Sequence, residues 1–382
     1  MTGLVAFGAV STDLYLPSLP AMTREFGVDV SLVQLTLSVF TFGFAAGMLV
    51  LGPMSDRFGR RPVLIGGVAI YVLASLGCLL APSVEALIGA RFVQALGAAA
   101  GPVIGRAIVR DVYTRVEAAR MLSYMASAMA LAPAVAPLIG GWLHETFGWQ
   151  ANFAALALFG ALILLGTLGL LRETNDSRDP RALKARRLVG TYRMLLTDRR
   201  FVGHTVVLTA MFGGLFSFIS GSSFVVIDVL GVAPGQFGLA FACVAGSYAA
   251  GAYMSGRVGH RLGLERAILL GALAGALIAG GGAGLAWAGI ETVPAVIAPV
   301  AGFFFCCAFV LPNGTAGAIN PFPHNAGSAS ALLGFLQMGG GALVGYGVGA
   351  LHDGTTRVML TSIALCAITA LIAHLTLVRP DE

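Results

Sequence analysis

Residues 52–62 read Gly52-Pro53-Met54-Ser55-Asp56-Arg57-Phe58-Gly59-Arg60-Arg61-Pro62, a charged segment set between two long apolar runs. The runs lie at 31–53 and 63–81. Each is long enough to cross a hydrocarbon core about 30 Å thick as a helix that rises about 1.5 Å per residue. The stretch therefore predicts two membrane-spanning helices joined by a short charged turn.

The composition of the whole chain is that of a membrane protein. Its 382 residues are 57% hydrophobic and 11% charged, which leaves too little polar surface to coat a soluble globule of this size. The apolar runs also lack the two-residue alternation of barrel strands. We therefore predict an all-α membrane protein.

Twelve apolar runs predict twelve transmembrane helices in two six-helix bundles. Residues 172–200 are polar, rich in arginine and without an apolar span, so they are expected to form a cytoplasmic linker between bundles 1–171 and 201–382. The expected spans are 2–22, 31–53, 63–81, 85–107, 119–143, 150–171, 201–226, 235–256, 266–288, 293–314, 326–350 and 357–378.

Most of the positive charge of the chain lies on one side of these spans, with only Arg24 and Arg357 expected on the other side and Arg91 within a span. A formal charge of +5 can indicate nucleic acid, but the basic residues lie in turns, so no nucleic-acid partner is expected. Positive charge accumulates in short cytoplasmic loops, which predicts that both termini are cytoplasmic. The expected inner set, besides the linker, is Arg57, Arg60, Arg61, Arg106, Arg110, Arg115, Arg120, Arg257, Arg261, Arg266 and Arg379.

The second half of the chain repeats the first. Residues 55–61 fall on 255–261, where serine, arginine and glycine recur, and residues 141–145 resemble residues 349–353. Parallel six-helix repeats are typical of transporters that rock two bundles about a central site. The repeat predicts pseudo-symmetric bundles.

The segment 52–62 and the twelve-helix plan resemble the major facilitator superfamily, whose loop between helices two and three reads G-x-x-x-D-R-x-G-R-R. Residues 11–20 (Ser-Thr-Asp-Leu-Tyr-Leu-Pro-Ser-Leu-Pro), 91–98 and 310–313 are similar to the Bcr/CflA group of drug:proton antiporters. This resemblance implies a proton-coupled multidrug efflux transporter of the bacterial inner membrane, with a role in antibiotic resistance.

Asp13 is the first candidate for proton coupling. It lies about 18 Å into the first span by helix rise, and a carboxylate inside a membrane is costly and therefore a functional hypothesis. The resemblance implies the same role, because the group carries an acid at this position. The alternative is a capping aspartate at a helix broken by Pro17 and Pro20.

Arg91 is expected at a similar depth, about 10 Å inside the fourth span. We predict that it lies close enough to Asp13 to hold the carboxylate ionised until substrate or a conformational change separates them. Gln94, one turn away on the same face, would extend a polar stripe into the substrate cavity. The alternative is that Arg91 extends toward the interface and only stabilises its span.

The charged segment itself is expected to act as a conformational latch. The resemblance implies that Asp56 meets the N-terminus of the eleventh helix, which is entered through residues 324–328, when the cytoplasmic side is closed. A plain topology anchor is the alternative. The residues assigned to the latch are Gly52, Asp56, Arg57, Gly59, Arg60 and Arg61.

The fifth span resembles the antiporter signature that ends G-P-x-x-G-G. Its matching residues are Pro133, Pro137, Gly140 and Gly141, whereas Ala136 replaces the signature glycine. Small residues allow close helix packing, and prolines kink a helix. Ordinary close packing without a role in setting transport direction is the alternative.

The substrate cavity is expected to be mostly apolar, which suits small lipophilic compounds. Its candidate residues are Tyr15, Gln94, Phe212, Phe216, Ser220 and Asn313. The five cysteines lie in apolar runs without ligand spacing, and no nucleotide-binding or hydrolase motif is present. We therefore expect no enzyme activity, no metal and no cofactor.

The sequence thus predicts a monomeric transporter whose partners are protons, a small lipophilic substrate and the lipid bilayer. A proton-coupled uptake symporter of the same fold would use the same acid and is the main alternative. A membrane receptor that does not transport is the second.

Overall fold

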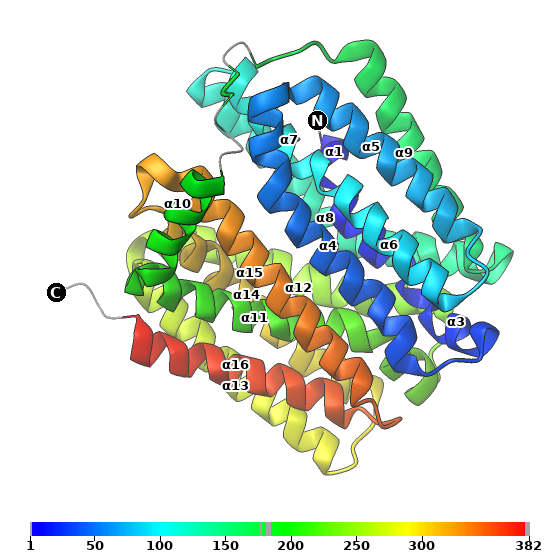
Figure 1. Ribbon diagram of the computed structural model, residues 1–382. Coiled ribbons are helices and arrows are strands. Elements are labelled where there is room, and N and C mark those ends of the chain that lie inside the picture. Colours follow the sequence, from blue (N-terminus) through cyan, green and yellow to red (C-terminus); the bar gives the residue numbers. More distant parts are fainter. Residues whose placement is uncertain (1, 176–177, 181–184, 379–382) are drawn as a thin grey trace. The chain divides into compact units, whose positions relative to one another are not determined.

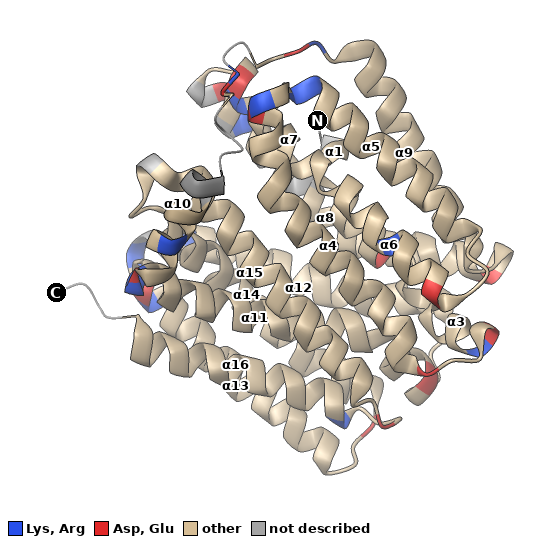
Figure 2. Ribbon diagram, viewed as in Figure 1, with Lys and Arg blue, Asp and Glu red and all other residues tan. Residues whose placement is uncertain are grey.

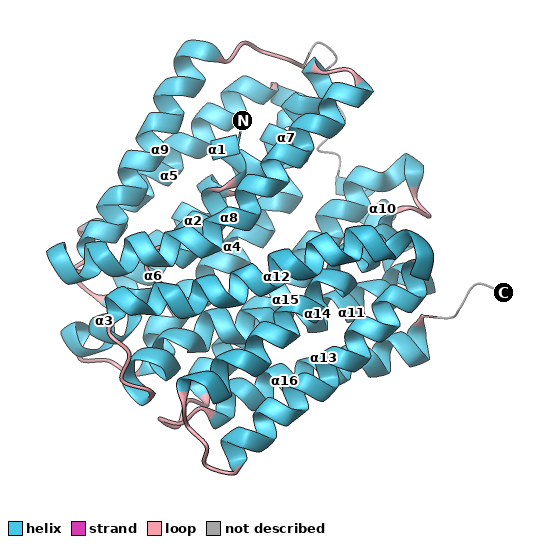
Figure 3. Cartoon of the chain, turned by 180° about the vertical axis from the view of Figure 1, so that it is seen from behind, coloured by secondary structure: helices cyan, strands magenta, loops and turns pink. Residues whose placement is uncertain are grey.

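The computed structural model describes residues 2–175, 178–180 and 185–378, and every regular element in these ranges is a helix (Figure 3). Each of the twelve predicted apolar runs coincides with helix, which confirms the all-α prediction. Arg379 and residues 181–184 of the predicted basic linker lie outside the described residues.

The chain forms two compact units, Met1–Arg186 and Arg187–Glu382, which divide within the expected linker (Figure 1). The helices of the first unit are α1 (Thr2–Val5), α2 (Phe7–Asp13), η1 (Leu16–Ser18), α3 (Leu19–Phe26), α4 (Val30–Phe58), α5 (Arg60–Leu79), α6 (Val84–Ala98), α7 (Ala100–Val112), α8 (Arg115–Phe147) and α9 (Gln150–Leu170).

The second unit begins within a helix that the sequence did not predict, α10 (Ala185–Thr197). Leu195 of α10 packs into an apolar cluster with Phe201, Leu208 and Leu332, so the C-terminal part of the linker belongs to the second bundle. The other helices are α11 (Arg199–Ser223), η2 (Phe224–Val229), α12 (Pro234–Leu262), α13 (Leu264–Trp287), α14 (Val293–Ile319), η3 (Pro323–Asn325), α15 (Ala326–Ala350) and α16 (Arg357–Leu377).

Ten helical stretches of the described chain are long and apolar enough to cross a membrane. Figure 2 shows α5, α9 and α16 without charged residues along their middles, as a hydrocarbon environment requires. The runs 2–22 and 119–143 are not among the ten. The first is broken into short helices, and α8 includes residues whose side chains are not described.

The break in the first span follows from its prolines. Pro17 has no N–H to donate to the carbonyl of Asp13, and Pro20 has none for Leu16, so two intrahelical hydrogen bonds are lost within four residues and the α-helix is interrupted here. The chain instead forms a short 3₁₀ turn, Leu16–Ser18, before α3 begins. The break thus falls immediately after Asp13, the last residue of α2.

The segment 52–62 is not the turn that the sequence predicted. Helix α4 continues through Pro53 to Phe58, and α5 begins at Arg60, so Gly59 alone joins them. Gly59 has φ = 106°, which L side chains rarely adopt, and a Cβ here would overlap the carboxylate of Glu173. Glycine is therefore required both by the backbone and by what lies against it.

Candidate proton-coupling site

The candidate site lies inside the first unit, where α2 ends. Asp13 is 3% exposed, and the Thr12 hydroxyl donates to its Oδ1 over 3.0 Å. The C-terminal end of a helix leaves its last carbonyl groups without intrahelical partners and carries a partial negative charge. Burial and this partial charge both disfavour the ionised form of a carboxyl group at the end of α2. This position is suited to a carboxyl group that exchanges a proton.

Arg91 of α6 is completely buried and satisfies one of these carbonyl groups. Its Nη2 donates to the Ser11 carbonyl oxygen over 3.1 Å, and its Nη1 donates to Gln94 Oε1 over 2.6 Å. The guanidinium carbon also lies 4.1 Å from the ring centre of Phe40 and 4.4 Å from that of Tyr15. Arg91 is therefore held by a helix end and by aromatic faces, both of which favour a cation.

The predicted ion pair between Arg91 and Asp13 is wrong for this structure. Both residues are described and buried, yet no nitrogen of Arg91 lies within ion-pair distance of the Asp13 carboxylate. Arg91 nevertheless reaches the last turn of α2, the turn that carries Asp13. The guanidinium reaches the backbone of Ser11 instead of the side chain two residues further on.

Gln94 belongs to this buried network. Its Nε2 donates to Ser75 Oγ over 2.7 Å while its Oε1 accepts from Arg91, so both ends of the amide are engaged. Ser75 in turn donates to the Tyr71 carbonyl, and the Tyr71 hydroxyl lies 2.7 Å from Ser11 Oγ. The network returns to α2 and fixes the turn that carries Asp13.

Tyr15 is also enclosed within the first bundle. Its side chain is fully buried, its hydroxyl lies 3.2 Å from Thr36 Oγ1, and its ring packs against Phe153. In this structure Tyr15 therefore supports Arg91, and a role of Tyr15 or Gln94 in binding substrate stays a prediction.

The fifth span meets the broken helix through a glycine. Gly140 of α8 lies so close to the backbone of α2 that a Cβ here would overlap the Leu14 carbonyl oxygen. Pro133, Pro137 and Gly141 all lie within the same helix, α8. The antiporter-type segment thus contacts the first span directly beside Asp13, and its influence on transport direction stays a prediction.

The latch residues form a second polar cluster of the first unit. Arg60 makes an ion pair with Asp56 and another with Asp111 of α7, whose Oδ2 lies 2.9 Å from its Nε. Its Nη1 also donates to Ser55 Oγ over 2.7 Å. Asp56 is thus engaged within its own unit, and its predicted contact with the eleventh helix stays a prediction.

Glu173 completes this cluster by capping α5. The backbone N–H groups of Arg60 and Arg61 donate to its two oxygens over 2.8 and 3.2 Å. Thr174 and Asn175 add two more backbone N–H donors. Partial burial opposes the charged form of Glu173, but the four donors outweigh it and hold its pKa below its usual range. The carboxylate therefore stays ionised at neutral pH and fixes the start of α5.

The remaining latch residues are less constrained. Arg61 donates from its side chain to the Leu171 carbonyl over 2.8 Å, whereas Arg57 is exposed beside the ring of Phe58. Gly52 lies within α4, where a Cβ would meet only one atom, at 3.9 Å. Gly52 is thus not sterically required in this structure.

The predicted cavity residues of the second unit do not all lie together. Phe212 and Phe216 stack on one another along α11, facing Gly341 and Gly345 of α15. Ser220 donates to the Gly345 carbonyl over 3.0 Å. These three line the contact between α11 and α15.

Asn313 lies apart from them on α14. Its amide nitrogen donates to the Phe309 carbonyl over 2.7 Å and reaches Ser255 Oγ of α12 at 3.5 Å. Its place in a substrate cavity stays a prediction.

Sequence reasoning missed the partners that organise both polar clusters. Glu173 could have been found as an acid directly after the sixth span, among basic residues. Asp111 is likewise the acid that follows Arg110 at the inner end of the fourth span. No sequence signal distinguished Ser75 or Tyr71, which lie in an apolar run.

The family model of the Major Facilitator Superfamily matches residues 1–345. The chain belongs to this superfamily. It is a transporter of the multi-pass membrane type, not an enzyme. The transporter is 31% identical to "Multidrug resistance protein D" of Escherichia coli (strain K12) over 343 residues, which cover 89% of this chain and 85% of that protein.

A second relative is "Bicyclomycin resistance protein homolog" of Haemophilus influenzae, 30% identical over 95% of this chain and 91% of that protein. These relatives confirm the Bcr/CflA-type resemblance. Among solved structures, a D-xylose-proton symporter superposes with a TM-score of 0.72 over 99% of this chain and 96% of that chain, at 17% identity. This similarity confirms the major facilitator fold of twelve helices in two bundles.

Proposed function

We propose that this transporter exports small lipophilic compounds in exchange for protons by alternating access, with protonation of Asp13 coupled to substrate release. One observation carries the proposal. A carboxylate that is 3% exposed lies at a helix break inside a membrane bundle, where it accepts a hydrogen bond from the Thr12 hydroxyl and has no cation in ion-pair distance among the described residues. Intramembrane carboxylates in such settings serve proton pathways.

Arg91 acts in this proposal as a positioning residue. It holds the Ser11 carbonyl, which belongs to the last turn of α2, while Gly140 packs closely against the Leu14 carbonyl on the other side of Asp13. Gain or loss of the proton changes the charge between these two supports. A shift of α2 against α6 and α8 is then the expected link between protonation and bundle movement.

The names of the two relatives, which refer to multidrug and bicyclomycin resistance, support efflux over uptake. Apolar and aromatic side chains among the predicted cavity residues favour lipophilic substrates. The proposal places the monomeric transporter in the bacterial inner membrane with both termini in the cytoplasm, because its basic residues gather on one side of the spans.

Inverted vesicles acidified inside test the proposal. An exporter should load a lipophilic cation or dye into the lumen, and Asp13→Asn should reduce this uptake to the level of vesicles without the protein. The same variant should retain counterflow of labelled substrate, which needs no proton gradient, and this separates loss of coupling from loss of folding. Asp29→Asn, at an exposed aspartate, is the matched control. Wild-type proton-driven uptake in Asp13→Asn would refute the assignment.

A proton-coupled uptake symporter is the second candidate, because the fold also serves a protein named as a D-xylose-proton symporter. The direction of flux separates the two, since a symporter would accumulate substrate in right-side-out vesicles that are acidified outside. A receptor built on the same fold would bind ligand without any counterflow.

A further inference from the structure

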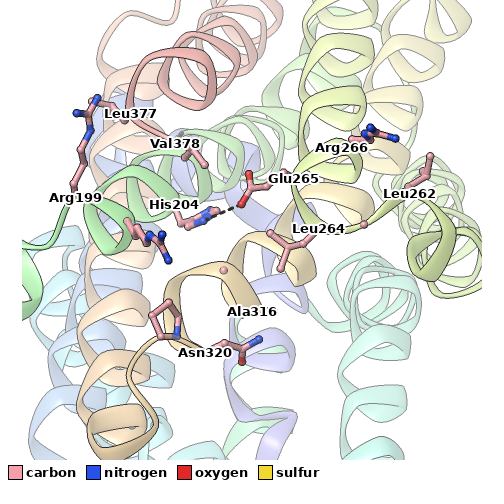
Figure 4. Close-up of a pocket in the computed structure, with 14 residues that line it drawn as sticks. Arg199, His204, Leu262, Leu264, Glu265, Arg266, Ala316, Asn320, Leu377 and Val378 are labelled. Carbon is pink, nitrogen blue, oxygen red and sulfur yellow. Dashed lines mark ion pairs between the residues drawn. The ribbon is translucent and has the colours of Figure 1, made fainter. Parts of the chain in front are cut away.

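The second unit contains a cavity of about 1310 Å³ at the end of the bundle where α11 and α13 begin and α14 and α16 end. Figure 4 shows its lining side chains. The cavity lies at the side predicted to face the cytoplasm. Its polar lining comes from Arg199, Arg200, His204, Glu265, Arg266 and Asn320.

Glu265 joins three helices at the wall of this cavity. It lies in the first turn of α13, and its Oε1 is 3.5 Å from Nε2 of His204 on α11 (Figure 4). Its Oε2 is 3.9 Å from Nδ1 of His374 on α16. The two histidines are only 4% and 6% exposed. One carboxylate therefore stands between two buried imidazoles from different helices.

The fourth helix of the cavity is shaped to accept one of these imidazoles. A Cβ at Gly317 of α14 would lie 2.6 Å from Nε2 and Cε1 of the His204 ring. Any larger residue would displace the ring from Glu265. The place of the imidazole is thus set by the backbone of α14 as well as by the carboxylate.

Histidine is the side chain whose charge ordinarily changes near neutral pH. The other cations at the cavity, Arg199 and Arg200 of α11 and Arg266 of α13, keep their charge throughout this range. The lining residues from α14 are uncharged. Helix α16 contributes His374, which lies beside Glu265. The strength of the contacts at Glu265 is therefore set by protons on the imidazoles.

We propose that Glu265, His204 and His374 form a proton-binding site of the second bundle, separate from Asp13, whose occupancy controls how tightly the adjoining cavity is closed. A proton taken from water in the cavity binds an imidazole nitrogen and turns its contact with Glu265 into an ion pair. An ion pair with His204 ties the start of α13 to α11, and one with His374 ties it to α16. Loss of the proton at higher pH removes the tie and loosens the cavity.

Two measurements on the purified full-length protein test this. Potentiometric titration between roughly pH 6 and pH 8 should show about one proton fewer bound per molecule in His204→Gln/His374→Gln than in the wild type. A nitroxide at Asn320→Cys, with exposed Cys243 changed to serine, should become more accessible to a soluble paramagnetic reagent as the pH rises. The double variant should lose this pH dependence.

Gly317→Ala keeps every titratable group and displaces only the end of the His204 side chain, so it should also lose the pH dependence of the nitroxide. Gly280→Ala, where a Cβ meets nothing within 4 Å, is its control, and His352→Gln controls for the loss of a histidine. All variants should elute as monodisperse protein. Asp13→Asn should keep the proton bound by the histidines and the pH dependence of the nitroxide accessibility, which separates this site from the proposed efflux mechanism.

An unchanged proton count in the double variant would show that the cluster binds no proton in this range. A reduced count with unaltered pH dependence of the nitroxide would show that the proton does not act on the cavity. Either result overturns the proposal.

Discussion

The cap that Glu173 places on α5 gives a prediction whose size can be worked out from the structure. Four backbone N–H groups converge on one partly buried carboxylate. A capping side chain at a helix start contributes about 0.5–2 kcal/mol, and a negative charge there adds about 0.3–1 kcal/mol. Glu173→Gln keeps the shape and an acceptor but loses the charge, so it should cost about 1 kcal/mol. Glu173→Ala should cost about 2 kcal/mol.

Thermal unfolding in detergent measures this cost. For a unit of this size, 1 kcal/mol corresponds to a lowering of Tm by about 2–4 °C. Cys78, buried in α5, reports unfolding through a thiol-reactive dye once exposed Cys243 is replaced by serine. Arg172→Gln, at the exposed neighbouring position, should leave Tm unchanged.

The same contact predicts a dependence on pH. Because the folded state lowers the pKa of Glu173, its stabilisation is fully present above the unfolded value of about 4.3. It is lost as the pH falls below that value through the folded pKa. The wild type and Glu173→Gln should therefore differ at pH 7 and converge below about pH 4. Equal Tm values at pH 7, or a difference that persists at low pH, would refute this account of the cap.

Two further predictions concern the supports of Asp13. Arg91→Lys keeps the charge but loses the planar group that reaches two hydrogen-bond acceptors and several aromatic rings. This loss should cost about 2 kcal/mol, so the rate of substrate counterflow should fall roughly thirtyfold. A wild-type rate would show that the guanidinium positions nothing. Gly140→Ala should lower stability by about 1–3 kcal/mol, because its Cβ overlaps the Leu14 carbonyl, while Gly166→Ala, where nothing lies within 4 Å, should stabilise by up to about 1 kcal/mol. Equal Tm values for these two glycine variants would contradict the close contact.

The helices were predictable because length and hydropathy alone decide which segments can cross a bilayer. The linker helix α10 was not predicted because its composition is polar, and the packing of Leu195 and Tyr192 against the second bundle stabilises it. The segment 52–62 was expected to turn because it is charged. In the structure, a single glycine with positive φ reverses the chain, so helix continues on both sides of it.

The Asp13–Arg91 pairing failed for a geometric reason. Helix rise fixes how deep a residue lies, and that estimate placed both residues at one level. It does not fix the direction in which a side chain leaves its helix, and a carbonyl freed at the end of α2 was the better acceptor for Arg91. A backbone carbonyl left open where a helix ends is invisible to reasoning from side-chain charges alone.

Comparison of the two copies of the charged segment explains why proton sensitivity is expected in only one of them. Gly59 joins α4 to α5, and Gly263, two residues after the second copy, joins α12 to α13; both have positive φ and no side-chain cap of their own. In the first unit, Glu173 fills the space beside Gly59 and stays ionised at neutral pH, so that junction is fixed. At Gly263 a Cβ would meet nothing within 4 Å, and the start of α13 is held through Glu265 by imidazoles instead. The two units therefore hold similar helix junctions with different partners, and the imidazoles beside Glu265 are what makes the second one responsive to pH.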